Sequence, residues 1–255
     1  MLRKHNDIKI SDLHCHILPG IDDGAENIDV SKELIEAEKK CGVSQIMFTP
    51  HFWADSMGYD SFFTDREKAY SQIKPLCDAA GIETKTGSEV RMMPQLEEMD
   101  LTRFAMGDTG YLLLEWPFIM YPLWGDSIVK NLLSHGIRPV FAHVERFDYF
   151  LDYPERLDRY IESGCLCQAN GGAVIHPQMQ KRVLDMIRDG RIHILSSDTH
   201  NPDKRPPRLD EAFEIIAKHL GSGIEEKMTA VADDIYNGRD VHADAPGRKK
   251  LFGFL

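Results

Sequence analysis

The hydrophobic and polar positions along the chain predict seven strand–helix units. Short apolar runs typical of buried strands alternate with segments in which apolar residues recur every three or four positions, as on an amphipathic helix. The predicted strands span residues 8–13, 43–49, 82–90, 111–116, 138–144, 165–170 and 191–197. The predicted helices span residues 30–40, 65–80, 123–135, 154–163, 177–188 and 208–220, with a short turn at 96–99 and two shorter segments at 223–231 and 233–236. A longer, aromatic-rich loop is expected at 52–64.

This order predicts an α/β protein with a parallel sheet, because each helical crossover returns the chain to the same end of the sheet. Seven units in 255 residues favour a closed or nearly closed barrel with outer helices. A doubly wound open sheet is the alternative architecture. No Gly-x-Gly-x-x-Gly follows a strand, so a dinucleotide site is unsupported. Without a break in composition or a linker, we expect residues 1–255 to form one domain.

Composition narrows the class of protein. A hydrophobic content of 42% with 28% charged residues is ordinary for a soluble globular protein. The net charge of −11 argues against a nucleic-acid partner, which requires a basic face. The five cysteines are an odd number and do not resemble a disulfide framework, which favours a reducing compartment. Residues 1–7 lack the apolar core of a signal peptide, and no apolar run approaches the roughly 20 residues that span a bilayer. We therefore expect a cytoplasmic protein without membrane insertion.

Metal-binding residue types gather where the predicted strands end. His14 and His16 lie two apart on the first strand, so their side chains project together while Cys15 turns away. The other strand ends carry His51, Glu89, Glu115, His143, Asp198 and His200. In a parallel barrel these ends share one rim, where catalytic residues collect. Each of these residues has an ordinary alternative role. An isolated His-x-His can be two half-buried histidines, Glu115 can be a charge on an edge strand, and His143 can be a hydrogen-bonded core residue.

The number of these side chains exceeds the needs of one ion. A single divalent ion takes roughly four to six protein and water ligands, whereas five histidines and at least three carboxylates are available. The set therefore implies two or more ions close together. Such clusters bridge a water molecule, lower its pKa and clamp the oxygens of an in-line displacement at phosphorus. Phosphoester hydrolysis is the reaction that suits this site best.

Several separated motifs, in the correct order, resemble the PHP (polymerase and histidinol phosphatase) family. They are Asp12-Leu13-His14-Cys15-His16, Thr49-Pro50-His51, Ala142-His143-Val144-Glu145-Arg146 and Ser197-Asp198-Thr199-His200-Asn201. Two further segments, 16–24 and 203–207, resemble the branch of bacterial manganese-dependent tyrosine-protein phosphatases associated with capsular and exopolysaccharide biosynthesis. The similarity runs from the first strand to about Leu220. It implies a distorted (β/α)7 barrel that holds three metal ions.

The resemblance also implies a ligand set. The first metal would take His14, His16, Glu89 and Asp198; the second would share Glu89 and add Glu115 and His143; the third would take Asp23, His51 and His200. Asp23 is assigned only through the resemblance, because the sequence alone does not distinguish it from its neighbour Asp22. Manganese is likewise implied by the family, and these nitrogen and oxygen ligands would also accept iron, zinc or cobalt.

Arg146 and Arg205 match the family positions that hold the substrate phosphate, and we expect them to be catalytic and substrate-binding residues. A guanidinium fork suits phosphate oxygens, although rim salt bridges are the alternative role. The implied mechanism is attack on phosphorus by a metal-bridging hydroxide. No phosphocysteine is expected, because no cysteine has an arginine six residues later.

The aromatic residues near the rim have two interpretations. Those after the second and fourth strands are Phe52, Trp53, Tyr59, Phe62, Phe63, Trp116, Phe118, Tyr121 and Trp124. They could line a slot for a tyrosine ring, but such residues more often pack a loop against its barrel.

The resemblance implies a phosphotyrosine-containing partner, a tyrosine kinase of polysaccharide biosynthesis, and leaves self-association open. The rival activity is that of a small-molecule phosphatase of the histidinol-phosphate type. A non-catalytic metal-binding regulatory module is the alternative outside enzymes. An amidohydrolase also begins with His-x-His, but it commonly uses a carboxylated lysine where this chain offers Glu89.

Overall fold

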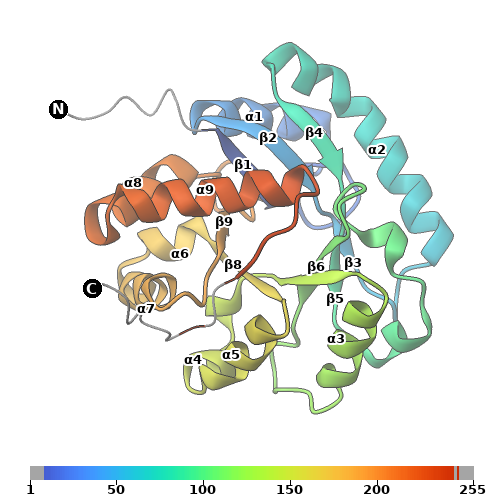
Figure 1. The fold of residues 1–255 in the computed structure, drawn as a ribbon. Helices are drawn as coiled ribbons and strands as arrows, with labels where there is room; N and C mark the ends of the chain where they lie inside the picture. The colour runs from blue at the N-terminus through green and yellow to red at the C-terminus, as the bar shows by residue number, and fades with distance from the viewer. Residues whose placement is uncertain (1–8, 244–245, 247–255) are drawn as a thin grey trace.

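A computed structural model describes residues 9–243 and 246. Parallel strands lie at the centre of the molecule and helices surround them (Figure 1). The strands are β1 (Ile10–Cys15), β2 (Val43–Phe48), β3 (His51–Phe52), β4 (Glu83–Thr86), β5 (Glu89–Arg91), β6 (Tyr111–Glu115), β7 (Arg138–Phe141), β8 (Leu166–Asn170) and β9 (Ile194–Ser196). They form one sheet of order β1-β2-β4 and a second of order β3-β5-β6-β7-β8-β9.

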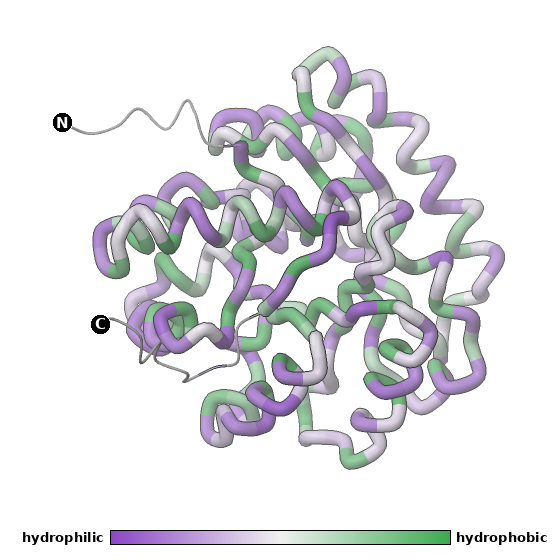
Figure 2. The backbone as a smooth tube through the Cα atoms, in the orientation of Figure 1, coloured by the Kyte–Doolittle hydropathy of each residue, from purple (hydrophilic) through white to green (hydrophobic). Residues whose placement is uncertain are grey.

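Helices connect most successive strands and cover the outside of the sheets; β2 runs directly into β3, and β4 into β5. The α-helices are α1 (Ile28–Lys40), α2 (Tyr59–Ala80), α3 (Gly125–Ser134), α4 (Asp148–Leu151), α5 (Glu155–Glu162), α6 (Gly171–Ile175), α7 (Pro177–Arg188), α8 (Leu209–Leu220) and α9 (Ser222–Tyr236). Short 3-10 helices lie at Pro94–Glu98, Thr102–Phe104 and Val144–Arg146. Apolar and polar residues alternate along the outer helices, as expected where one face packs on the sheet (Figure 2).

The strand order follows the chain, as a barrel requires. A doubly wound sheet reverses its order at a switch point, and neither sheet does so. The two ends of the array also meet, because the backbone N–H of Asp198, after β9, donates to the carbonyl of His14 at 2.8 Å. The backbone N–H of His16 donates in turn to the carbonyl of Thr199 at 2.9 Å. The predicted parallel α/β barrel is confirmed, and the open-sheet alternative is wrong.

The interior of the barrel is a separate apolar cluster. One fully buried side chain from each of six strands contributes to it: Leu13, Met47, Leu113, Val140, Leu166 and Ile194. Ala232 and Ile235 of α9 pack against this cluster. The larger apolar cluster lies between the strands and the surrounding helices. A filled interior leaves only the carboxyl ends of the strands to hold polar side chains.

Strand alternation explains why the polar residues reach the rim. Glu115 lies two residues beyond the interior Leu113, and Asp198 lies four beyond Ile194, so both continue the inward-facing set. β1 departs from simple alternation, because its pairing with β2 shifts register between Asp12 and Cys15. Leu13 therefore belongs to the interior cluster while Cys15 packs in the outer one.

Several strand ends differ from the prediction by two or three residues, as at Cys15 and Phe141, and three predicted elements differ more substantially. α2 begins at Tyr59 and not near residue 65, because Phe62 and Phe63 lie on its buried face and the expected loop is thereby shortened. The strand expected at 82–90 is divided into β4 and β5, which belong to different sheets. The two segments expected at 223–236 form the single helix α9, since no helix-breaking residue separates them.

Candidate metal centre

Glu89 lies at the centre of the rim site. It begins β5, and its side chain is fully buried. Oε2 lies 3.2 Å from Nε2 of His14 and 3.3 Å from Nε2 of His16, while Oε1 lies 2.9 Å from Nε2 of His143. Glu115 Oε1 lies 3.5 Å from the same nitrogen of His143. Glu89 Oε2 also lies 2.8 Å from Nδ1 of His51 on β3, so one carboxylate faces side chains on or just after β1, β3 and β7.

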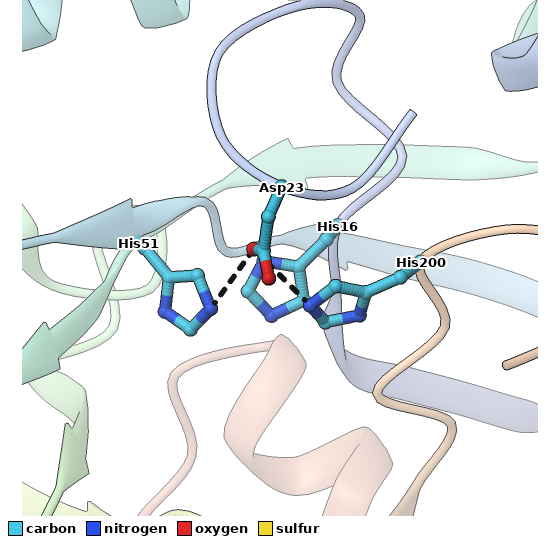
Figure 3. A group of neighbouring side chains, drawn as sticks. All are labelled: His16, Asp23, His51 and His200. Carbon is cyan, nitrogen blue, oxygen red and sulfur yellow. Dashed lines mark ion pairs between the residues drawn. The ribbon is translucent and has the colours of Figure 1, made fainter. Parts of the chain in front are cut away.

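A second group surrounds Asp23, on the loop after β1. The Asp23 carboxylate points between the rings of His51, His16 and His200 (Figure 3). Its Oδ1 lies 3.4 Å from Nε2 of both His51 and His200. The ring centroids of His16 and His200 are 4.0 Å apart, and those of His16 and His51 are 4.3 Å apart. The side chain of Asp23 is 63% exposed, so this group lies at the open side of the site.

All nine residues expected to bind metal come together. Within the described part of the chain, four groups have ligand atoms within 4.8 Å of one another: His16, Asp23, His51 and His200; His14, Glu89 and His143; His14, His16 and Asp198; and His51, Glu89 and Glu115. This grouping differs from the expected assignment at three histidines. His14 lies with Glu89 and His143, and His51 lies with Glu89 and Glu115. His16 lies with the Asp23 group as well as with His14, so it faces two of the expected metal positions.

The histidine hydrogen bonds direct ring nitrogens into the site. Nδ1 of His14 lies 3.2 Å from the side-chain oxygen of Gln168, and Nδ1 of His200 lies 3.0 Å from the carbonyl of Asp198. In the neutral ring, an N–H at Nδ1 places the lone pair on Nε2. For His200 that lone pair faces Oδ1 of Asp23, and for His14 it faces Oε2 of Glu89. Two acceptors that face each other need a proton or a metal ion between them.

Unpartnered buried atoms support the same conclusion. Among the described residues, Glu89 Oε2, His51 Nδ1 and His200 Nε2 are buried without a hydrogen bond of acceptable geometry, and the first two of these atoms lie 2.8 Å apart. Such atoms are costly in a folded protein unless something supplies the missing interaction. The available donors are imidazole nitrogens and carboxylate oxygens, which suit divalent transition metals. The residues present therefore fit divalent ions at this rim.

Two carboxylates at the centre, Glu89 and Asp198, are held ionised, whereas burial raises the pKa of Glu115 to about 7. Burial would raise the pKa of Glu89, but the positive charge that His14 and His51 carry when protonated outweighs burial and holds that pKa well below its usual value. Burial likewise opposes ionisation of Asp198, whose pKa is held well below its usual range by His14 and His16. Burial lowers the pKa of His143 and favours its neutral form.

Two of the site residues have a strained backbone. His143 has a φ of 31° and Asp198 a φ of 52°, the two positive values among the described non-glycine residues. Side chains disfavour this left-handed region, and strain of this kind clusters at functional sites. At His143 and at Asp198 the backbone turns away from the direction of the preceding strand, and the side chain stays over the end of the barrel.

The site also contains polar groups that the sequence reasoning missed. Gln168 and Asn170, on β8, face it: Gln168 contacts His14, and Nδ2 of Asn170 donates to Oδ2 of Asp198 at 2.6 Å. Asp22 belongs to none of the four groups and holds Nδ1 of His16 at 2.7 Å. Strand parity could have found Gln168 and Asn170, because both lie an even number of residues beyond the interior Leu166.

Arg146 and Arg205 lie beside the centre and contact the same carboxylate. Nη2 of Arg205 donates to Oδ2 of Asp198 at 2.6 Å, and Nη1 of Arg146 lies 3.7 Å from that oxygen. The side chain of Arg146 is 44% exposed and that of Arg205 is 38% exposed. Both line a cleft of about 710 Å³ that leads away from the site. The rim salt bridge considered as the alternative role is therefore present for Arg205. Its remaining N–H groups and those of Arg146 stay available to the cleft.

Most of the aromatic residues near the rim pack the core. Phe52, Phe62 and Phe63 are buried and surround Phe104, and Trp116 is buried against Phe141 and Phe150. Of the nine aromatic residues considered for a slot, Phe118 alone lines the cleft. Its ring stacks beside His143 and under the guanidinium of Arg146.

The five cysteines are buried and carry free thiols. Burial raises the pKa of Cys15 well above its usual value, and Cys15 lies in the outer apolar cluster, facing away from the site as expected from its place between His14 and His16. None of the five belongs to a group of potential metal ligands in the described residues. Within the same residues, no helix is both long and apolar enough to cross a bilayer.

Comparison with known proteins identifies the family. The profile of the family described as "Capsular polysaccharide synthesis, CpsB/CapC" matches residues 10–234. The chain is 30% identical over 254 residues to tyrosine-protein phosphatase YwqE of Bacillus subtilis (strain 168), covering 96% of this chain and 99% of that protein. It is also 30% identical over 227 residues to tyrosine-protein phosphatase CpsB of Streptococcus pneumoniae, covering 83% and 91% of the two chains.

Solved structures agree. The fold superposes with a TM-score of 0.84 and 26% identity on a structure described as YwqE from Bacillus subtilis and CpsB from Streptococcus pneumoniae, unique metal-dependent tyrosine phosphatases, over 93% of this chain and 98% of that one. A histidinol phosphate phosphatase of Lactococcus lactis shares only the fold, at a TM-score of 0.53 and 14% identity over 85% and 94% of the chains. The chain belongs to the CpsB/CapC capsular polysaccharide synthesis family.

Proposed function

We propose that this protein is a metal-dependent protein-tyrosine phosphatase of capsular or exopolysaccharide synthesis. The observation that carries the proposal is the convergence of imidazole lone pairs and ionised carboxylates on one buried rim, in a chain whose relatives are named tyrosine-protein phosphatases. The phosphotyrosine-containing partner proposed for it is a tyrosine kinase of the same biosynthetic system.

The ligand set proposed is that of three divalent ions, with Mn²⁺ first and iron, zinc or cobalt as alternatives. The ligands are His14, His16, Asp23, His51, Glu89, Glu115, His143, Asp198 and His200. When bound, such ions supply Lewis acidity at phosphoryl oxygens and lower the pKa of water towards neutrality. An anomalous-scattering map of the rim would give the number and identity of the ions.

The chain's own residues bind and orient the substrate. Arg146 and Arg205, which line the cleft beside Asp198, present guanidinium N–H groups that suit the oxygens of a phosphoryl group. Fixed donors of this kind stabilise the charge on those oxygens without reorganisation during the reaction. Phe118, between Arg146 and His143, offers a flat apolar surface for an aromatic ring.

Hydrolysis assays test the proposed function. Purified protein loaded with Mn²⁺ should hydrolyse a phosphotyrosine peptide, and His143→Ala should abolish this activity while circular dichroism shows the same fold. Activity on histidinol phosphate alone would instead assign the small-molecule function. A metal-loaded sample that hydrolyses no aryl phosphate, including para-nitrophenyl phosphate, would assign a non-catalytic metal-binding role.

A further inference from the structure

The cleft beside the metal centre extends well beyond the phosphoryl site. Its inner end is formed by Asp198, Arg146 and Arg205. From there it runs between α4 and the segment formed by α6, α7 and residues 204–208. A volume of about 710 Å³ is within the range of roughly 300–1,000 Å³ typical of small-molecule clefts, and it exceeds the needs of one phosphoryl group. The outer part therefore has room for a neighbouring part of the substrate.

The outer part of the cleft is basic in a strongly acidic protein. Arg182 on α7, Lys204 and Arg208 line it, while its carboxylates outside the metal centre are Glu145 and Asp148. Glu145 is buried beneath the cleft, where its Oε1 accepts the backbone N–H of Asn170 at 3.0 Å. The net charge of the whole chain is −11. A local excess of positive charge in a cleft concentrates the field there and attracts acidic groups.

Two of these cations have no internal role. Arg208 forms a two-contact pair with Glu211, at 2.9 and 2.6 Å, and its charge is thereby compensated. No hydrogen bond or ion pair joins the side chains of Arg182 or Lys204 to another described residue, and both side chains are exposed. They are therefore free to pair with a ligand.

We propose that Arg182 and Lys204 form an acidic-residue subsite that selects phosphotyrosines flanked by Asp or Glu. This inference rests on the proposed function, because it places the phosphoryl group at Arg146 and Arg205. The substrate would be an acidic segment of a phosphoprotein whose carboxylates reach the outer cleft while the phosphotyrosine occupies the inner end. Rim charge pairs of this kind contribute mainly to selectivity and to the association rate, and salt weakens them.

The test compares two peptides that each carry one phosphotyrosine, flanked by Glu in one and by Gln in the other. The Mn²⁺-loaded wild-type protein should have a kcat/KM about five- to tenfold higher on the acidic peptide at low salt, since two exposed pairs contribute a few-fold each. This preference should disappear at about 0.5 M NaCl, where the screening length falls to a few ångströms.

Variants locate the effect. Arg182→Ala/Lys204→Ala should remove the preference through KM, and Arg182→Glu/Lys204→Glu should reverse it towards a Lys-flanked peptide. Neither should change kcat on para-nitrophenyl phosphate, which cannot reach the outer cleft. Lys181→Ala is the matched control, because Lys181 is the neighbouring cation on α7, pairs with Asp185 and does not line the cleft. It should behave as wild type.

Each other result overturns the inference in a recognisable way. Equal hydrolysis of both peptides by the wild type, or a preference that persists in the double variants, removes the subsite and leaves the phosphatase function standing. Loss of para-nitrophenyl phosphate hydrolysis in the alanine variant would place these residues in the catalytic machinery instead. If the wild type hydrolyses neither peptide but does hydrolyse histidinol phosphate, the proposed function fails and the subsite with it.

Discussion

The side-chain oxygen of Gln168 lies 3.2 Å from Nδ1 of His14, and the same oxygen accepts the backbone N–H of His143 at 2.7 Å. One amide on β8 thus orients a histidine on β1 and the strained turn after β7. Nε2 of Gln168 donates to Oδ1 of Asn170 at 2.9 Å, which fixes the orientation of the amide. Groups that hold the outer nitrogen of a metal-binding histidine set its tautomer and its basicity.

Loss of this amide should weaken metal binding. Gln168→Ala leaves Nδ1 of His14 without its acceptor, and we expect about 10- to 100-fold weaker Mn²⁺ affinity, measured by competition with a chelator. Gln168→Glu keeps a hydrogen-bond acceptor at the same place and should lose less Mn²⁺ affinity than Gln168→Ala. Unchanged affinity in the alanine variant would show that another group sets the tautomer of His14.

A chelator should abolish activity, whereas a thiol reagent should leave it unchanged. Burial raises the pKa of Cys41, Cys77 and Cys165 to about 12, so these thiols stay protonated and unreactive at neutral pH. Iodoacetamide should leave hydrolysis of para-nitrophenyl phosphate unchanged in the native protein, whereas EDTA should abolish it and added Mn²⁺ restore it. Inactivation by iodoacetamide with full metal occupancy would contradict a metal-dependent mechanism.

A side chain at Gly24 should disturb the metal centre from outside it. A Cβ atom there would lie 2.1 Å from the carbonyl oxygen of His16 and 2.5 Å from its Cβ. Gly24→Ala should therefore displace the loop that carries Asp23, lower metal occupancy and cost about 1–3 kcal/mol of unfolding free energy, as overpacking does. The measurements are metal analysis and denaturant unfolding.

Gly223→Ala is the matched control for this substitution. Gly223 lies in α9, and a Cβ there would have nothing within 4 Å. The control should retain its metal and gain up to about 1 kcal/mol, because alanine favours a helix more than glycine does. If Gly24→Ala keeps full activity and stability, the loop accommodates the added Cβ without displacing Asp23, and the prediction is wrong.

A buried carboxyl on α1 should make stability depend on pH. Burial raises the pKa of Glu38 well above its usual 4.5, and the nearby charge of Asp12 raises it further. The folded protein therefore keeps a proton that the unfolded chain releases above pH 4.5, so the unfolding free energy falls as pH rises through that range. Glu38→Gln removes this titration while keeping a polar side chain.

The Glu38→Gln variant should accordingly gain stability relative to wild type as pH increases from 5 to 8. Denaturant unfolding at several pH values measures the difference. If the unfolding free energies of the two proteins change in parallel with pH, Glu38 ionises normally in the folded state.

The sequence by itself determined the parallel barrel and the positions of the expected ligands. Both follow from local pattern, because alternation along a strand continues the inward-facing set from Leu113 to Glu115 and from Ile194 to Asp198. The spacing of His14 and His16 placed the two rings together for the same reason, since their Nε2 atoms lie 3.1 Å apart.

Only the tertiary structure decided which atoms meet at the rim. The register shift in β1 depends on its pairing with β2, and the division of 82–90 into two strands depends on which sheet each half joins. The loop sequence left Asp22 and Asp23 equivalent, whereas in the folded chain Asp22 holds His16 and Asp23 faces His51 and His200. Periodicity reports the face of a residue, but its partner is set by strands that are far apart in the sequence.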